Sequence, residues 1–259
     1  NGGDPTLRDS IVLARKAPRA AGTRYPAGLA LSPDGRTLYV AENLADSLAV
    51  VDVATRRVVA RYATERYPLA VVVAADGTVY VSAWGGSTVS VFTPGPASHS
   101  PLVADARIAA GRHPSALLLD DTGTRLYVAS GSTDRVTVVD TRTRRAVATL
   151  HDAPPGAPGR GPAPGEGSTP DALALSTDGT RLFVAEADNN AVAVFDLSPA
   201  TSGRAAARGA DTLVGRIPVE WYPTALATAA GGGGGDTLLV VSGKGRGTGP
   251  NPDGPTPYH

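Results

Sequence analysis

The sequence predicts an all-β fold built from repeated four-stranded antiparallel units, and two observations predict it. First, a stretch that begins near Pro26 returns four more times along the 259 residues. Each copy opens with a proline, namely Pro26, Pro68, Pro114, Pro170 and Pro223, and in the first four copies a glycine follows nine residues later. Second, each full copy divides into short runs rich in Val, Leu and Tyr, separated by turn residues. A repeat of roughly 40–50 residues indicates a solenoid, a propeller or another array.

The first copy shows what one repeat must be. Its apolar runs lie at residues 29–31, 37–41, 48–52 and 58–62, and the turn Ser32-Pro33-Asp34-Gly35 separates the first two. Asp-Gly supplies the residue tolerant of positive φ that a tight hairpin needs. Four short strands in sequence order, with an apolar first strand, predict a β-propeller blade whose first strand lines the axis. The aspartates that end the third run, Asp52, Asp140 and Asp196, are expected to cap backbone amides.

About five blades are represented, at residues 24–66, 67–112, 113–167, 168–219 and, in part, 220–259. A strand candidate at 10–15 resembles the outer strand of a blade. Two interpretations stay open: this strand closes a five-bladed ring, or the chain is a piece of a larger ring. Two insertions, at 151–167 and 198–211, interrupt the pattern, and the first is so dense in Pro and Gly that we expect a surface loop or a linker.

Composition excludes several classes of function. The 24 basic and 24 acidic residues give a net charge of zero, which argues against a nucleic-acid partner. No apolar run is long enough for a membrane span, and no signal peptide is recognisable. The absence of Cys excludes disulfides and thiolate chemistry. Methionine is also absent and the first residue is Asn1, so we expect a processed product or a fragment.

The blade pattern resembles a known repeat family. It reads PAGLALSPDGRTLYVAENLADSLAVVD, PSALLLDDTGTRLYVASGSTDRVTVVD and PDALALSTDGTRLFVAEADNNAVAVFD. These stretches resemble the YVTN-type propellers, also called lactonase-like or surface-layer-like, which are typically seven-bladed. The stretch from Trp221 to Pro255 is similar to bacterial propellers that precede an alkaline-phosphatase-like phosphoesterase domain. The resemblance implies a bacterial periplasmic or extracellular protein.

Candidate ligand or partner residues lie in the loops that join second to third strands and in those that lead into each first strand. Both loop sets share one face of a propeller, where ligands bind. The candidates are Trp84, His113, Trp221, Glu42, Asn43, Glu186, Asp188, Asn189 and Lys244. Their oxygen-bearing members are ligand types for a calcium-type ion. Turn propensity alone also explains them, and we predict no cofactor, no metal and no catalytic residue set.

Three hypotheses of function follow. The first is a non-catalytic scaffold or binding module that holds a protein partner or a neighbouring domain. The second is the propeller portion of a phosphoesterase whose catalytic domain lies elsewhere. The third is a lactonase-like hydrolase, for which Arg112, His113, Glu42 and Glu186 are the only plausible set.

Overall fold

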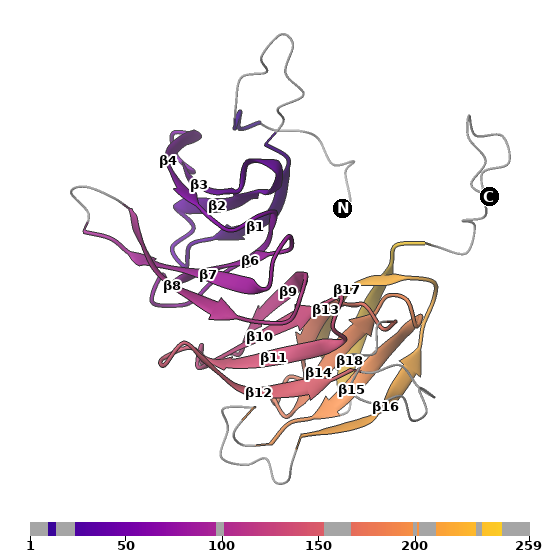
Figure 1. Ribbon diagram of the computed structural model, residues 1–259. Helices are drawn as coiled ribbons and strands as arrows, with labels where there is room; N and C mark the ends of the chain where they lie inside the picture. Colours follow the sequence, from indigo (N-terminus) through magenta and orange to yellow (C-terminus); the bar gives the residue numbers. More distant parts are fainter. Residues whose placement is uncertain are drawn as a thin grey trace, which may run out of the picture. The chain divides into compact units, whose positions relative to one another are not determined.

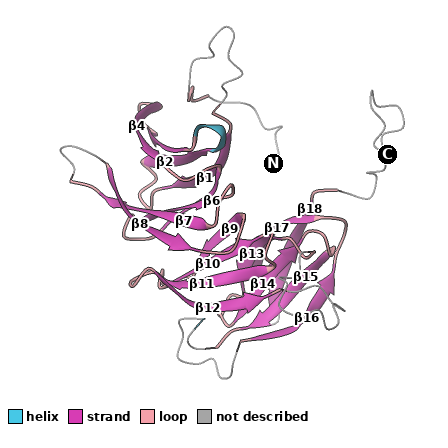
Figure 2. Ribbon diagram, viewed as in Figure 1, coloured by secondary structure: helices cyan, strands magenta, loops and turns pink. Residues whose placement is uncertain are grey.

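The computed structural model describes residues 10–13, 24–96, 101–152, 167–198, 201, 211–231 and 235–244. Strands provide almost all of the regular secondary structure in these ranges (Figures 1 and 2). The chain divides into two compact units, Asn1–Ala109 and Ala110–His259. No helix in the described ranges is long and apolar enough to cross a membrane.

The first unit holds two four-stranded sheets, each with its strands in sequence order. Blade one comprises β1 (Pro26–Leu31), β2 (Thr37–Glu42), β3 (Ser47–Asp52) and β4 (Arg57–Ala63), with a short 3-10 turn at Asn43–Ala45. Blade two comprises β5 (Pro68–Val73), β6 (Val79–Ala83), β7 (Thr88–Pro94) and β8 (Leu102–Ala109).

The second unit holds two further four-stranded sheets and a two-stranded sheet. Blade three comprises β9 (Pro114–Leu119), β10 (Arg125–Ser130), β11 (Arg135–Asp140) and β12 (Arg145–His151). Blade four comprises β13 (Pro170–Leu175), β14 (Arg181–Glu186), β15 (Ala191–Asp196) and β16 (Thr212–Pro218). The fifth repeat contributes β17 (Pro223–Ala230) and β18 (Asp236–Ser242). Neighbouring strands of every sheet are antiparallel, as the sequence predicted.

The repeated proline and glycine mark the same structural points in each blade. Every first strand begins at its proline. The predicted hairpin glycines Gly35, Gly77, Gly123 and Gly179 all have positive φ, between 69° and 84°. In blade one, Gly35 closes the turn by donating its N–H to the carbonyl of Ser32 at 2.8 Å. The predicted glycine hairpin turns are therefore confirmed, because glycine adopts positive φ without steric cost.

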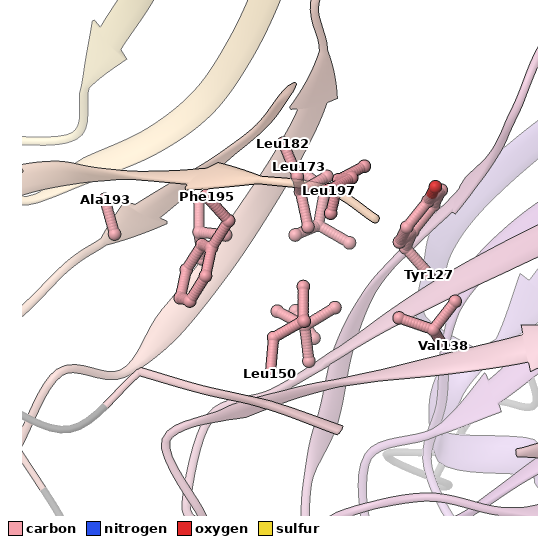
Figure 3. Close-up of a cluster of buried hydrophobic side chains, with 11 residues drawn as sticks. Tyr127, Val138, Leu150, Leu173, Leu182, Ala193, Phe195 and Leu197 are labelled. Atoms are coloured by element: carbon pink, nitrogen blue, oxygen red, sulfur yellow. The ribbon is translucent and has the colours of Figure 1, made fainter. Parts of the chain in front are cut away.

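Apolar side chains from adjacent blades form the cores. In the first unit, Val50 and Leu48 of blade one pack in one cluster with Val81 and Phe92 of blade two. The ring of Tyr62 lies 5.7 Å from that of Phe92 between centroids. In the second unit, blades three and four share a cluster that includes Tyr127, Leu150, Leu173, Leu182 and Phe195 (Figure 3). Within each unit, the two four-stranded blades thus bury apolar side chains against each other.

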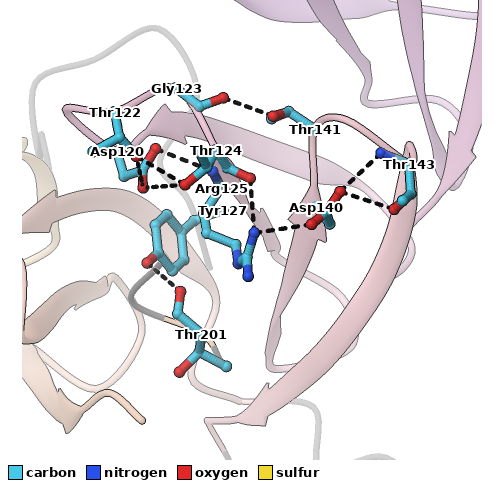
Figure 4. A network of polar contacts seen from close by, with 10 residues as sticks. All are labelled: Asp120, Thr122, Gly123, Thr124, Arg125, Tyr127, Asp140, Thr141, Thr143 and Thr201. Carbon is cyan, nitrogen blue, oxygen red and sulfur yellow. Dashed lines mark hydrogen bonds and ion pairs between the residues drawn. The ribbon is translucent and has the colours of Figure 1, made fainter. Parts of the chain in front are cut away.

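The aspartates at the ends of the third strands behave largely as predicted. The Asp52 carboxylate accepts the backbone N–H of Thr55 at 2.6 Å, and that of Asp140 accepts the N–H of Thr143 at 2.8 Å. Figure 4 shows the second turn, where Asp140 also pairs with Arg125 at 3.0 Å. Asp196 instead pairs with Arg181 at 2.9 Å. In the same region the buried hydroxyl of Tyr127 donates to the carbonyl of Thr201 at 2.7 Å.

The chain start differs from the prediction. Residues 10–13 form no strand, and Ile11 and Leu13 instead pack against the cluster of Val40, Ala49 and Val51 in blade one. Most of both predicted insertions, with residues 14–15 and 245–259, lies outside the described residues. These stretches of the predictions are therefore untested.

At Gly28, in the first unit, we predict that any added side chain would destabilise the protein. A Cβ at this position would collide with the carbonyl oxygen of Leu69 and lie 3.0 Å from Ala70 Cα, both in the backbone of β5. We expect Gly28→Ala to destabilise the protein by about 1–3 kcal/mol through overpacking. Gly215 in β16 has no atom within 4 Å of the corresponding position, so Gly215→Ala serves as the control. Thermal melting of both variants checks this, and equal melting temperatures would contradict it.

Candidate functional site

A repeated backbone arrangement builds the loop face of each unit. The residue before each proline has positive φ, between 49° and 62°, and these residues are Tyr25, Tyr67, His113, Thr169 and Tyr222. In every repeat the carbonyl of that residue accepts an N–H from the loop that follows the second strand, which in the four full blades leads to the third strand. The five N···O distances are 2.9, 2.9, 3.0, 3.1 and 2.7 Å. The carbonyl one residue earlier accepts the next amide of the same loop, at 3.0–3.4 Å. The two predicted loop sets therefore do share one face in each blade.

Side chains from the preceding repeat hold three of these positive-φ residues. The carboxylate of Asp46 accepts the N–H of Tyr67 at 2.8 Å, and the amide oxygen of Asn190 accepts that of Tyr222 at 2.9 Å. Asp134 does the same for Thr169 at 3.1 Å. A non-glycine residue at positive φ costs of order 1–3 kcal/mol and persists where its surroundings hold it. The hydrogen bonds on both sides of the residue supply that support.

The candidates in the first unit take different positions. Trp84 is 44% exposed on the loop face. The side-chain amide of Asn43 donates to the carbonyl of Pro68 at 3.1 Å, which ties it to the backbone. Glu42 lies inside the protein with no exposed surface. Its carboxylate accepts hydrogen bonds from Arg61, Arg24 and Ser47, at 3.0, 3.0 and 2.7 Å.

The charge of Glu42 is therefore balanced by arginine. Burial alone would raise the pKa of this carboxyl, but Arg61, Ser47 and Arg24 outweigh that effect and lower it below its ordinary value. Glu42 is a buried ion-pair residue of blade one.

The candidates in the second unit lie on three successive repeats. His113 precedes β9, and its Nδ1 contacts the hydroxyl of Ser132. Asp188 accepts the hydroxyl of Thr169, and the Asn189 amide donates to Ser168 Oγ at 2.9 Å. Trp221 is 48% exposed, and the amino group of Lys244 stands 5.2 Å from the centre of its ring and 4.6 Å from that of Tyr222. These contacts bring Trp221 and Lys244 together, and they bring Asp188 and Asn189 together.

Glu186 belongs to a buried cluster that we call the Arg216 pocket, made of Asp134, Asp152, Glu186 and Arg216. Arg216 Nε lies 2.7 and 2.8 Å from the two carboxylate oxygens of Glu186. Its Nη2 lies 3.7 Å from Asp152, which like Glu186 has no exposed surface. The Asp152 N–H donates to the carbonyl of Asp134 at 2.8 Å, which links the end of blade three to the turn between β10 and β11.

Sequence reasoning missed one carboxyl group on the loop face, Asp171. It is the second residue of β13, and burial raises its pKa. Burial also raises the pKa of the neighbouring Tyr222 hydroxyl, and the charges of Asp188 and Asp171 raise it further. A signal was present, because the residues after the five prolines are Ala27, Leu69, Ser115, Asp171 and Thr224, and only one is acidic. Asp171 is the candidate for proton transfer on this face.

The oxygen-bearing candidates do not gather into a metal site. Within the described ranges, no group of three or more His, Cys, Asp or Glu side chains could hold a metal ion. Glu42 and Asn43 belong to the first unit, while Glu186, Asp188 and Asn189 belong to the second. The two glutamate carboxylates already bind arginine.

The comparisons place the chain among lactonase-like folds. Residues 16–132, less than half of the chain, match the family model described as "SMP-30/Gluconolactonase/LRE-like region". The comparison with curated proteins found no match. The periplasmic gluconolactonase PpgL of Pseudomonas aeruginosa superposes with a TM-score of 0.61 at 20% identity, over 84% of this chain and 57% of that one.

Two further solved structures give the same result. A candidate 6-phosphogluconolactonase of Bacteroides fragilis has a TM-score of 0.60 at 17% identity, over 84% of this chain and 58% of that one. A streptogramin B lyase has a TM-score of 0.57 at 12% identity, over 85% and 66%. This chain therefore spans less than two thirds of the length of each structure. At these identities the likeness shows the fold alone, and with the four-stranded sheets it confirms a β-propeller. The YVTN-type assignment and the phosphoesterase-linked subgroup stay predictions.

Arg216 is predicted to be essential to the second unit. Arg216→Ala would leave Glu186 and Asp152 buried without a cation, so we expect a loss of about 3–5 kcal/mol in the free energy of unfolding. The loss should be larger at pH 8 than at pH 5. Without Arg216 the pKa of Asp152 in the folded variant rises further above its unfolded value, and stability from a retained proton disappears as the pH rises.

Arg181→Ala is the control for Arg216→Ala. Arg181 pairs with Asp196 at 2.9 Å, but both side chains are about half exposed, so its loss should cost less than about 1 kcal/mol. Chemical denaturation at the two pH values measures both variants. Equal losses would show that burial of the charges does not decide their contribution.

Proposed function

We propose that this chain is the propeller of a lactonase-like hydrolase that opens a cyclic ester of a polar substrate such as a sugar lactone. The observation that carries the proposal is Asp171, a half-buried carboxyl group at the start of the inner strand β13 with a raised pKa. The match to the gluconolactonase-type family model and the likeness to two lactonase folds support the class of reaction. We therefore rank the lactonase-like hydrolase above the non-catalytic scaffold, which no observation specifically supports.

Asp171 has the position and chemistry of a general base. Its carboxylate would accept a proton from a water molecule as the water oxygen attacks the lactone carbonyl carbon. The bond between that carbon and the ring oxygen then breaks, and the proton passes to the ring oxygen, which leaves a hydroxy acid. A raised pKa makes the Asp171 carboxylate a stronger base. The charges of Asp171 and Asp188 both act on the neighbouring Tyr222 hydroxyl.

Neighbouring loop-face residues would bind the substrate. Trp221 offers an exposed aromatic surface, and Lys244 beside it offers an ammonium donor to hydroxyl or carboxylate oxygens. His113 and Ser132 add a second polar pair at the entrance to β9. Polar side chains around an exposed aromatic ring suit a hydroxylated ring compound. The periplasmic setting of the Pseudomonas aeruginosa enzyme supports a periplasmic location for this chain as well.

Lactone hydrolysis tests the proposal. We expect the wild type to hydrolyse D-glucono-1,5-lactone or a related aldonolactone, followed by acid release at pH 6, where spontaneous hydrolysis is slow. Asp171→Asn should lower kcat/KM by about 100-fold or more, since a general base contributes about 10²–10⁴-fold. In the wild type, kcat/KM should rise with pH through an apparent pKa above the ordinary aspartate value, because the ionised carboxyl is the active form.

Asp178→Asn is the matched control, since Asp178 lies in the exposed turn after the opposite end of β13. It should retain wild-type kcat/KM. An inactive wild type towards aldonolactones, or equal rates in the two variants, would contradict the assignment and return the scaffold hypothesis to first place.

A further inference from the structure

The Arg216 pocket carries more negative than positive charge. Asp134, Asp152 and Glu186 are 3%, 0% and 0% exposed, and among the described residues Arg216 is the cation that pairs with Glu186 and Asp152. With every carboxyl ionised, these four described residues would carry a net charge of about −2 inside the protein. Burying even one uncompensated charge is strongly unfavourable. Something must neutralise part of this charge.

Hydrogen bonding leaves Asp152 as the carboxyl with the weakest support for a charge. Both oxygens of Glu186 are bound by Arg216, and one oxygen of Asp134 accepts the backbone N–H groups of Ser168 and Thr169, at 3.2 and 3.1 Å. Within the described residues, no N–H or O–H group donates to either carboxyl oxygen of Asp152, whose hydrogen-bonding neighbour is the Glu186 carboxyl, and its ion pair with Arg216 is long at 3.7 Å. Arg216 therefore binds Glu186 more closely than Asp152.

In the equivalent cluster of blade one, arginine side chains neutralise the buried carboxylate of Glu42. Arg61 occupies the strand position of Arg216, because they pair with Ala49 and Ala193 at matching points of β3 and β15. Glu42 also receives Arg24 and Ser47. In blade four, Ser168 stands at the position of Arg24 and Ala191 at the position of Ser47. Glu186 therefore lacks the second arginine and the serine hydroxyl that Glu42 has, while Asp152 adds a further carboxyl group.

We propose that the Arg216 pocket holds one proton at neutral pH, carried by Asp152, and that losing it at alkaline pH loosens the junction between blades three and four. Burial, and then the adjacent Glu186 carboxylate, raise the pKa of Asp152 well above its usual range, while Arg216 opposes this and Asp134 adds to it. These are the charged groups that act on Asp152 from β14, from β16 and from the turn after β10. A metal ion is a poorer fit, since Arg216 already occupies the cluster.

Loss of the proton would reach the loop face through named contacts. The Asn189 amide donates to Glu186 at 3.3 Å and to Ser168 Oγ at 2.9 Å, and Asp134 holds the N–H of Thr169. The Thr169 hydroxyl in turn binds Asp188. A second negative charge beside Glu186 would strain these contacts. The pocket therefore makes the loops around Asp171 sensitive to alkaline pH, whatever reaction they serve.

Infrared spectroscopy tests the proton directly. The wild type at pH 7 should show the C=O stretch of a protonated carboxylic acid, and Asp152→Asn should lose it. The exposed Asp178 provides the control, since Asp178→Asn should keep the band. A wild type without the band, or a band that persists in Asp152→Asn, would overturn the proposal.

Equilibrium unfolding supplies a second readout that does not depend on enzymatic activity. An unfolded aspartate has released its proton above about pH 3.9, whereas folded Asp152 keeps it, so wild-type stability falls as pH rises through this window. Between pH 5 and 8, the unfolding constant of the wild type should increase relative to that of Asp152→Asn by up to about tenfold per pH unit. Parallel pH profiles would contradict this, as would destabilisation by a chelator in the wild type but not in the variant.

Discussion

The carbonyl group before each repeat proline is the constraint on which the loop face depends. It points to the loop that follows the second strand because its residue has positive φ, and it accepts an N–H of that loop in all five repeats. Proline then begins the first strand, since it needs no donor there. This repeated backbone hydrogen bond thus fixes where each first strand starts and which side chains lie next to it. Asp171, Trp221 and His113 owe their positions to it.

Charge balance is the second constraint, and it differs between repeats that share a backbone. In blade one, two arginines and a serine surround the buried Glu42. In blade four one arginine serves Glu186 while Asp152 enters from the preceding blade. A buried carboxyl tolerates its charge only with a cation and hydrogen bonds around it. The same strand geometry therefore supports an ordinary ion pair in one unit and a protonated carboxyl in the other.

The sequence predicted the strands because their signals are local. Pro170, Gly179 and the apolar runs between turns each specify one element, and the structure confirms them. The placement of Glu42 and Glu186 was not predictable in this way. Turn propensity suggested an exposed rim, but their burial depends on Arg61 and Arg216, about 20–30 residues later in the outer strands. Asp134 and Asp152 were missed for the same reason, since only the packing of blade three against blade four brings them to Glu186 and Arg216.

Function in a repeat protein is best sought where one copy departs from the others. Positions that agree across copies, such as the prolines and the hairpin glycines, are explained by the backbone. Asp171 stands where other copies have Ala27, Leu69, Ser115 and Thr224. The shared backbone geometry does not explain why an acidic residue is partly buried there. Partial burial of Asp171 without a charged partner among the described residues is what the proposed role as a general base would explain. Asp171 is therefore a better candidate than Glu186, because the ion pair with Arg216 already explains the burial of Glu186.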